Sequence, residues 1–261
     1  MPLIAAKNIS FSYPSVMNGF ALRDVSLDID RREFISILGP NGSGKSTLLR
    51  LLSGVLKPGK GELYLDGQDY GSLSHKDIAK LIAFVPQNTH SIFPFSVYEI
   101  VMMGRTPHLN YLGYESREDH DIVQEALGRV GITDLMNKGI NEVSGGEAQR
   151  AFLARALVQK PSIVLLDEPN AHLDIKHQLS FFNLLEKLNE EESLSVVFVS
   201  HDLSLSGQFG KRGILIKDGT IYMDDSKERV ITTENIKHIF EVDSEIMTTG
   251  NNNFHVLINS N

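Results

Sequence analysis

The first residues that could do chemistry form a glycine-rich segment that ends in lysine, serine and threonine. The segment fits G-x-x-x-x-G-K-[ST] and reads Gly39-Pro40-Asn41-Gly42-Ser43-Gly44-Lys45-Ser46-Thr47. Its glycines allow successive backbone N–H groups, with the N-terminus of a following helix, to point at phosphate oxygens. Lys45 would add a charge for the β- and γ-phosphates, and Ser46 a hydroxyl for Mg²⁺. The segment predicts a nucleotide site, and a glycine-rich turn capped by Ser43 is the alternative.

Two adjacent carboxylates, Asp167 and Glu168, end an apolar segment that begins at Ile163. Neighbouring side chains on a strand point to opposite sides, so separate roles are expected for the two acids. Asp167 can hold hydrated Mg²⁺, and Glu168 can orient or deprotonate the water that attacks the γ-phosphate. A strand that ends in a capping Asp-Glu pair is common, so this interpretation depends on the phosphate loop.

A second glycine-containing segment, Val143-Ser144-Gly145-Gly146-Glu147, precedes the helical sequence AQRAFLARAL. Ser144 and the two glycines at the start of a helix would form another anion-binding terminus, far in sequence from the first. The same residues could be no more than a helix cap. The residues alone leave both interpretations open.

The hydrophobic pattern predicts an α/β fold. Strands are expected at residues 4–12, 21–29, 33–39, 61–65, 82–85, 162–169, 193–200 and 212–219. Helices are expected at 45–53 and 175–189, with short helices around Val230 and 236–240 and a last strand near the C-terminus. Between about residues 97 and 158, helical periodicity replaces the strand pattern. We therefore expect a P-loop nucleoside triphosphatase core with an antiparallel β subdomain (1–96 and 159–261) and a helical insertion (97–158).

Composition narrows the classes of function. The 261 residues are 41% hydrophobic and 22% charged, which is typical of a globular protein. The absence of cysteine excludes a disulfide scaffold, a thiolate metal site and a cysteine nucleophile. A net charge of −8 makes nucleic acid an unfavourable partner. The spacing of His172, His177 and His201 does not favour a transition-metal site, and we expect neither a secretory signal nor a membrane span.

With these motifs in their observed order, the chain resembles the ATP-binding subunits of ABC transporters over Tyr13 to His201. The segment 143–147 is similar to that family's LSGGQ motif, with Val143 for leucine and Glu147 for glutamine. Asn170 stands where threonine or serine is more frequent. The segments 95–108 and 173–178 resemble the ATPases of iron–siderophore, haem and cobalamin importers. We interpret Glu147 as a marker of that subgroup and not as a sign of an inactive site.

The resemblance assigns roles to further residues. Gln87 matches the glutamine that touches Mg²⁺ and the attacking water, and His201 matches the histidine that contacts the γ-phosphate. Tyr13 matches the aromatic residue that stacks on adenine, although a strand-end tyrosine with a solvated hydroxyl is the alternative. The segment Leu173-Asp174 matches the loop through which two subunits sense each other's sites. In the family, the Ser144 segment closes over the γ-phosphate bound by the opposite subunit.

The resemblance also implies the cofactors and partners. The expected protein binds ATP and Mg²⁺ as a head-to-tail homodimer at the cytoplasmic face of the cell membrane, beside separate permease subunits and indirectly a substrate-binding protein. Its expected function is to power import of a metal chelate such as iron–siderophore, haem or cobalamin. Another importer or exporter ATPase, or a nucleic-acid-associated ABC ATPase, is the alternative. Apolar residues that could dock on the permease are Ile92, Phe93, Phe95 and Met102, although burial in the insertion's own core is as good an explanation.

Overall fold

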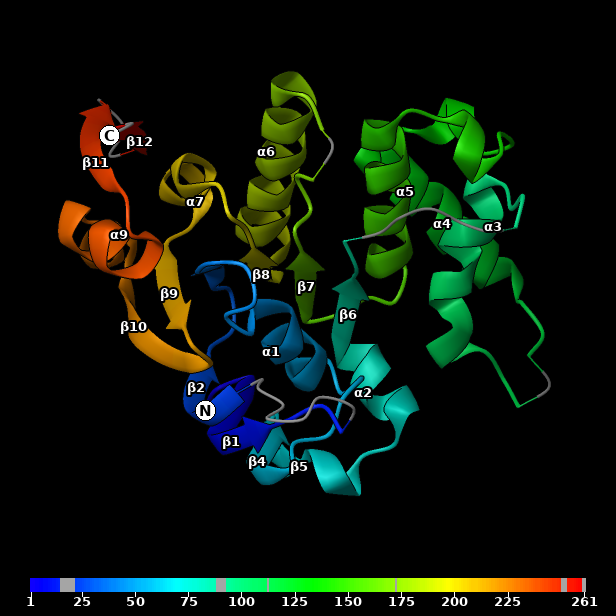
Figure 1. The fold of residues 1–261 in the computed structure, drawn as a ribbon. Coiled ribbons are helices and arrows are strands. Elements are labelled where there is room, and N and C mark those ends of the chain that lie inside the picture. The colour runs from blue at the N-terminus through cyan, green and yellow to red at the C-terminus, as the bar shows by residue number, and fades with distance from the viewer. Residues whose placement is uncertain (15–21, 88–92, 112, 172, 250–252, 260–261) are drawn as a thin grey trace.

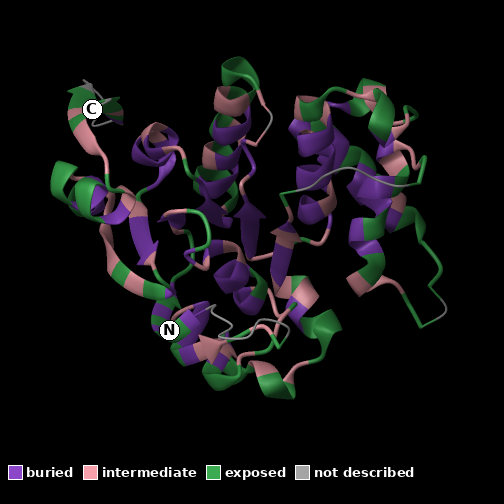
Figure 2. Ribbon diagram, viewed as in Figure 1, coloured by how far each residue is buried: buried purple, intermediate pink, exposed green. Residues whose placement is uncertain are grey.

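A six-stranded sheet forms the centre of the molecule (Figure 1). The computed structural model describes residues 1–14, 22–87, 93–111, 113–171, 173–249 and 253–259. The strands of this sheet are β3 (Phe34–Leu38), β6 (Ile82–Val85), β7 (Ile163–Asp167), β8 (Ser195–Val199), β9 (Arg212–Lys217) and β10 (Thr220–Ser226). Their order is β10-β9-β3-β8-β7-β6; β10 pairs antiparallel with β9, and the other pairs are parallel. The central strands β3, β7 and β8 are buried at every residue, as expected for parallel strands covered on both faces (Figure 2).

A second, antiparallel sheet is formed by strands from residues 4–69 and packs against the central sheet. It consists of β1 (Ile4–Phe11), β2 (Leu22–Ile29), β4 (Lys60–Leu65) and β5 (Gln68–Asp69), in the order β2-β1-β4-β5. Residues of both sheets and of helix α1 (Lys45–Leu52) form one buried apolar cluster. The phosphate-loop segment therefore connects two elements that are fixed by the same core, β3 before it and α1 after it.

Helical elements occupy the segment between β6 and β7, as the periodicity predicted. They are α3 (Val97–Met102), η2 (Met103–His108), α4 (Arg117–Val130), η3 (Thr133–Leu135), η4 (Ile140–Glu142) and α5 (Gly145–Leu157). Figure 1 shows them as a separate group beside β6. Their apolar side chains belong to one buried cluster that also includes side chains of the central sheet. The group is therefore packed on the core and not merely tethered to it.

A buried ion pair holds η2 inside this helical group. Arg105 Nε donates to Asp119 Oδ1 at 2.8 Å, and its Nη1 donates to the carbonyl oxygen of Val158 at 2.6 Å. Burial would raise the pKa of Asp119, but hydrogen bonds from Ser116 and Arg105 lower it to about 2. A Cβ atom on Gly104 would lie 2.0 Å from the carbonyl oxygen of Arg155, so the neighbouring position requires glycine. These contacts give the Gly104-Arg105 motif a packing role.

The remaining elements complete the core and the C-terminal part. They are η1 (Tyr70–Ser72), α2 (His75–Leu81), α6 (Ile175–Glu192), α7 (Leu203–Phe209), α8 (Lys227–Val230), α9 (Thr233–Phe240), β11 (Asp243–Thr249) and β12 (Asn253–Asn259). The predicted strands and helices correspond to observed elements, with shifts of a few residues at their ends. Sequence analysis did not predict α2, α7, β5, β10 or β11. In the described part of the chain, none of the helices is both long enough and apolar enough to cross a bilayer.

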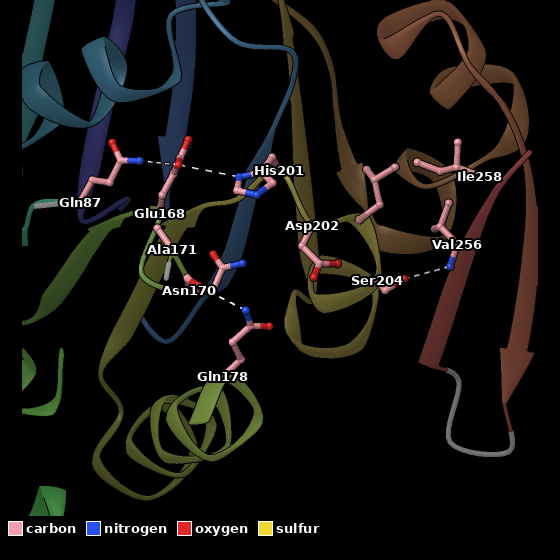
Figure 3. A pocket seen from close by; sticks show the side chains of 11 residues that line it. Gln87, Glu168, Asn170, Ala171, Gln178, His201, Asp202, Ser204, Val256 and Ile258 are labelled. Atoms are coloured by element: carbon pink, nitrogen blue, oxygen red, sulfur yellow. Dashed lines mark hydrogen bonds and ion pairs between the residues drawn. The ribbon is translucent and has the colours of Figure 1, made fainter. Parts of the chain in front are cut away.

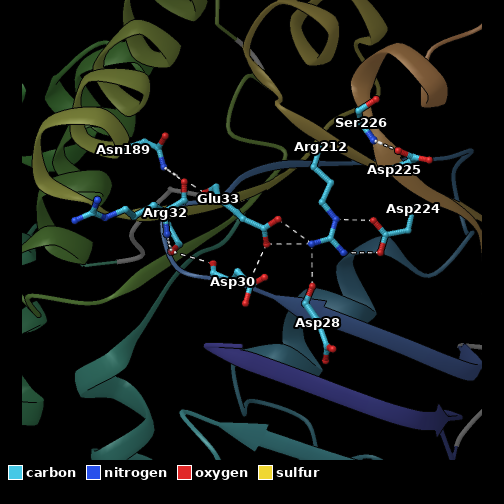
Figure 4. Close-up of polar contacts among 10 residues, drawn as sticks. Asp28, Asp30, Arg32, Glu33, Asn189, Arg212, Asp224, Asp225 and Ser226 are labelled. Carbon is cyan, nitrogen blue, oxygen red and sulfur yellow. Dashed lines mark hydrogen bonds and ion pairs between the residues drawn. The ribbon is translucent and has the colours of Figure 1, made fainter. Parts of the chain in front are cut away.

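Arg212 links the two sheets through a network of charged groups (Figure 4). Its guanidinium makes two hydrogen bonds to Asp224, at 2.6 and 2.7 Å, and two to Glu33, at 2.9 and 3.0 Å. It also donates to the carbonyl oxygen of Asp28 at 2.9 Å. Hydrogen bonding to Asp224 raises the pKa of Arg212. One cation therefore joins the β2–β3 connection to both strands of the β9–β10 pair.

We expect Arg212→Leu to lower the free energy of unfolding by about 2–4 kcal/mol, because it leaves two partly buried carboxylates without their cation. Urea denaturation followed by circular dichroism measures the change. Arg229→Leu is the matched control, because the Arg229 side chain is 75% exposed in its pair with Asp225. The control should lose less than about 0.5 kcal/mol. Equal losses in both variants would contradict a structural role for the Arg212 network.

Candidate functional site

The phosphate loop forms a helix N-terminus that no side chain caps. Gly44 is the N-cap residue of α1, with φ 106°, and no side-chain hydrogen bond caps this helix in the described structure. Side chains accept hydrogen bonds at the starts of α2, α3, α4, α5, α6, α7 and α9, whereas the four-residue helix α8 also lacks a side-chain cap. Ser43 is not the cap, because its hydroxyl is buried and has no hydrogen-bond partner among the described residues. The N–H groups at the start of α1 are therefore suited to bind an anion.

Two glycines of the loop meet steric requirements. Gly39 has φ 154°, and a Cβ atom there would lie 2.1 Å from the carbonyl oxygen of Ile216. Gly42 has φ 79°, in the left-handed region that side chains disfavour. The loop can therefore turn closely over strand β9 and still present its N–H groups.

Lys45 lies under the loop that precedes it. Its Nζ donates hydrogen bonds to the carbonyl oxygens of Gly39, at 2.8 Å, and Pro40, at 2.9 Å. Burial lowers the pKa of Lys45, while the charges of Glu168 and Asp167 oppose that shift. The ammonium group is thus held within the loop and lies close enough to the carboxylates of Asp167 and Glu168 to be affected by their charges.

The side chains of Ser46 and Asp167 bring together two oxygen atoms that could act as metal ligands. Ser46 Oγ donates to Asp167 Oδ1 at 2.8 Å, across the carboxyl end of β7. Burial raises the pKa of Asp167, and the hydrogen bond from Ser46 opposes that effect. No group of three or more His, Cys, Asp or Glu side chains that could hold a metal occurs in the described ranges. An oxygen-only pair fits a hard cation that takes its other ligands from phosphate and water.

Glu168 does not continue the strand alternation that sequence analysis assumed. Strand β7 ends at Asp167, and Glu168 has φ 47°. Its side chain accordingly lines a cavity of about 280 Å³ together with Lys45, Ser46 and Tyr13. Asp167 and Glu168 therefore both approach the phosphate loop, which alternation alone would not allow.

Two further predicted residues meet at the Glu168 carboxylate (Figure 3). Gln87 Nε2 donates to Glu168 Oε2 at 2.7 Å, and His201 Nδ1 lies 3.8 Å from the same oxygen. The first comes from the segment after β6 and the second from the segment after β8. Because parallel strands end at one edge of a sheet, residues far apart in sequence converge there.

Tyr13 lies at the side of the nucleotide cavity. Its hydroxyl is 3.3 Å from Thr47 Oγ1, and its ring packs edge-on against Phe11 with ring centroids 4.9 Å apart. Asn41, Gly42 and Gly44 line the same cavity. The position is compatible with the predicted contact to a base, but the alternative of a strand-end tyrosine keeps the same geometry.

The Ser144 segment lies away from the phosphate loop of its own chain. Figure 1 shows α5 within the helical group, separated from α1 by β6 and β7. None of the segment's residues lines the nucleotide cavity described above. Ser144 caps α5: its Oγ accepts from the N–H of Glu147 at 3.4 Å, and its own N–H donates to Glu147 Oε2 at 2.7 Å. The structure thus confirms the cap and, within one chain, does not join Ser144, Gly145, Gly146 and Glu147 to the nucleotide site.

Asp174 has a similar capping role on α6. It accepts hydrogen bonds from the N–H and from Nδ1 of His177, both at 2.8 Å. The backbone hydrogen bond from His177 lowers the pKa of Asp174. Gln178 Nε2 donates to the carbonyl oxygen of Leu173 at 2.8 Å and so holds the loop before α6. His172 lies outside the described residues.

Sequence analysis missed residues that border the site next to His201. Asp202 caps α7 by accepting from the N–H of Leu205 at 3.0 Å. Val256 and Ile258, from the C-terminal hairpin, line a cavity of about 600 Å³ that also contains Glu168 and His201. An aspartate directly before the segment 203–209, whose apolar residues are Leu203, Leu205 and Phe209, is an N-cap signal that could have revealed α7. No local signal predicts that a C-terminal strand reaches this cavity.

Comparison with known proteins identifies closely similar sequences and folds. A family model described as "ABC transporter" matches residues 22–171. The iron(3+)-hydroxamate import ATP-binding protein FhuC of Bacillus subtilis is 36% identical over 227 residues, which cover 87% of this chain and 84% of the relative. A solved structure assigned to the metal-chelate type of ABC transporter, in an inward-facing conformation, has a TM-score of 0.84 at 26% identity and covers 99% of this chain and 97% of its own. A solved structure of a dimeric ATP-binding cassette with ADP and Pi has a TM-score of 0.75 at 35% identity. The match covers 86% of this chain and 98% of that one.

The Glu147 cap generates a prediction about the departure from glutamine. Because glutamine can accept the same hydrogen bonds at this position of a capping box, Glu147→Gln should retain ATP hydrolysis within about twofold. Glu147→Ala removes the side-chain half of the capping box, the acceptor for the Ser144 N–H and hydroxyl, and should lower hydrolysis about fivefold, the equivalent of about 1 kcal/mol, without changing nucleotide binding by the single chain. Phosphate release and nucleotide-binding assays measure the two effects. A Gln variant as impaired as the Ala variant would show that Glu147 acts by its charge and not as a cap.

Proposed function

Because this chain belongs to the ABC transporter family of ATP-binding proteins, we propose that it powers import of a metal chelate by hydrolysing ATP. The observation that carries this proposal is the convergence of Lys45, Ser46 and Glu168 on one cavity beside the phosphate loop, with Asp167 hydrogen-bonded to Ser46. The cargo class rests on the similarity to a hydroxamate import ATPase and to a metal-chelate type transporter. ATP hydrolysis coupled to transport is the activity of the family.

In the proposed mechanism, the loop residues bind the triphosphate of ATP. Lys45 exchanges its hydrogen bonds with Gly39 and Pro40 for contacts to the β- and γ-phosphates. Ser46 and Asp167, with Gln87 as a third proposed ligand, would hold Mg²⁺, which when bound would neutralise phosphate charge. Tyr13 stacks on the adenine at the side of the cavity.

Glu168 acts on the attacking water. Gln87 and His201 approach one oxygen of its carboxylate, Oε2, and so orient the side chain. The carboxylate accepts a proton from the water, and His201 contacts the γ-phosphate. Most of the rate enhancement would come from positioning and electrostatics around the γ-phosphate.

A second copy completes the site in this proposal. The Ser144 tip of α5 is exposed and lies away from the phosphate loop of its own chain. In a head-to-tail dimer, Ser144, Gly145 and Gly146 of each copy would cover the γ-phosphate bound by the other. The dimeric ATP-binding cassette with a similar fold supports this arrangement.

Partners beyond the dimer follow from the family. We place the chain at the cytoplasmic face of the cell membrane, on a permease supplied by other chains, with a substrate-binding protein acting indirectly. Phe93 is 63% exposed and contacts Phe95, which is partly buried, so this pair is the proposed docking surface. Met102 does not belong to this surface: it is 6% exposed and lies in the buried cluster of the helical group, so for this residue the alternative of burial in the insertion's core is the correct one. Ile92 lies outside the described residues.

The role of Glu168 is tested by Glu168→Gln. We expect ATP hydrolysis to fall at least about 100-fold, because the amide cannot accept the proton of the attacking water. Binding of a fluorescent ATP analogue should persist, and size-exclusion chromatography with MgATP should show a dimer. Glu191→Gln is the control, since Glu191 is 65% exposed at the far end of α6. Near-normal turnover by Glu168→Gln would remove this residue from the chemistry.

The docking surface is tested by Phe93→Glu in the complex with the permease. A charge placed in an apolar contact should abolish permease binding and the transport-coupled part of ATP hydrolysis, while hydrolysis by the isolated chain remains. Val55→Glu is the matched control, because Val55 is also 63% exposed but follows α1. Copurification with the permease and ATPase assays give the readouts. Unchanged binding and coupling would require another docking surface.

A further inference from the structure

The backbone of Glu168 adopts a conformation that side chains disfavour. Its φ of 47° lies in the left-handed region, and the next residue, Pro169, restricts the backbone before it further. Such a conformation persists only where neighbouring contacts fix it. On its N-terminal side, the N–H of Glu168 donates to the carbonyl oxygen of Val199 on β8 at 3.2 Å. The contacts that fix the chain after Glu168 therefore also determine where its carboxylate lies.

Two consecutive turns follow Glu168 and lead to α6. The N–H of Ala171 donates to the carbonyl oxygen of Glu168 at 3.1 Å, and the N–H of Leu173 donates to the carbonyl oxygen of Asn170 at 3.3 Å. Asn170 is 4% exposed, yet its Oδ1 has no hydrogen-bond partner in the described part of the chain. This buried oxygen does not anchor the turns, and their anchor comes from another element.

The side chain of Gln178 joins the two turns to α6 (Figure 3). Its Nε2 donates to the carbonyl oxygen of Leu173 at 2.8 Å and to that of Asn170 at 3.3 Å. The backbone N–H of Gln178 donates to the carbonyl oxygen of Asp174, the N-cap residue of α6, at 2.9 Å. One amide group with two hydrogens thus ties the main chain that begins two residues after Glu168 to a regular helix.

We propose that Gln178 is a positioning residue for ATP hydrolysis, because it holds the main chain that keeps the Glu168 carboxylate beside the γ-phosphate. The inference rests on the proposed function, in which Glu168 acts on the attacking water. Gln87 and His201 approach the side-chain oxygen Oε2 of Glu168, whereas Gln178 acts on the main chain that follows. Without the Gln178 amide, the two turns relax and the carboxylate moves, although every group that lines the nucleotide cavity is retained.

Gln178→Met tests this role, because methionine has nearly the volume of glutamine but no N–H donor. We expect kcat for ATP hydrolysis to fall about tenfold while the Kd for MgATP stays within about twofold, because Gln178 does not line the nucleotide cavity. Lys187→Met on the same helix is the matched control, since the Lys187 side chain is 65% exposed. Phosphate release and binding of a fluorescent ATP analogue are the readouts. A Gln178→Met chain with the kcat of the control would overturn the inference.

A double-mutant cycle separates the positioning of Glu168 from a general structural role. In the Glu168→Gln background, single-turnover phosphate release should agree within about twofold with and without Gln178→Met, because the group that Gln178 positions is already absent. A general loss of structure would instead lower hydrolysis by the same factor in both backgrounds. Equal losses in the two backgrounds would therefore overturn the positioning role.

Dimerisation distinguishes this role from an effect on the second copy. Size-exclusion chromatography with MgATP should give dimerisation constants within about twofold for Glu168→Gln with and without Gln178→Met. A weaker dimer in the double variant would place the action of Gln178 at the interface and overturn the inference. Near-normal turnover by Glu168→Gln alone would overturn the proposed role of Glu168 together with the inference. An impaired Glu168→Gln beside a fully active Gln178→Met would overturn the inference alone.

Discussion

The uncapped N-terminus of α1, at the carboxyl edge of a buried parallel sheet, is the constraint on which the rest of the site depends. A helix start without a side-chain cap leaves N–H donors that favour an anion. Strands β3, β7 and β8 end at this edge, so Lys45, Asp167 and His201 follow from the topology of the sheet. The core between the two sheets fixes α1, and the Arg212 network ties the sheets to each other. Stability and phosphate binding therefore depend on the same packing.

The two helices that begin in glycine-containing segments, α1 and α5, differ in whether a side chain caps their N-terminus. Gly44 provides no side chain at the start of α1, whereas Ser144 and Glu147 satisfy each other at the start of α5. A self-capped terminus keeps its shape without a ligand, which suits a surface that must meet a neighbour in one conformation. The start of α5 is also fixed by its packing against the first turn of α6, where Gly146 approaches His177. In the proposed function, the uncapped start of α1 binds phosphate of its own chain's nucleotide, and the capped start of α5 faces a second chain.

Much of the fold and of the single-chain site follows from sequence patterns, and the exceptions have physical reasons. Buried parallel strands are continuous apolar runs, so 33–39 and 162–169 were readily predicted. Helix α2 was missed although Ser74 and Asp77 form a capping box, because its seven residues carry little periodicity. The direction of Glu168 could not be predicted, since its φ of 47° breaks the alternation of β7. The burial of Met102 and the position of Ile258 depend on contacts between distant segments, which local patterns do not contain.

The charges of the site explain why a divalent cation belongs to the proposed mechanism. Asp167 and Glu168 lie near the ammonium group of Lys45, and the charge of Arg50 also acts on Asp167, so the cations here only balance the two carboxylates. A triphosphate adds further negative charge and leaves the site with a negative balance unless another cation binds with it. The oxygens of Ser46 and Asp167 provide the place where a hard cation reverses that balance. Burial of the ionised Asp167 carboxylate is unfavourable on its own and becomes favourable when the cation and the nucleotide bind together. The affinity for the cation therefore depends on the nucleotide, and the affinity for the nucleotide depends on the cation.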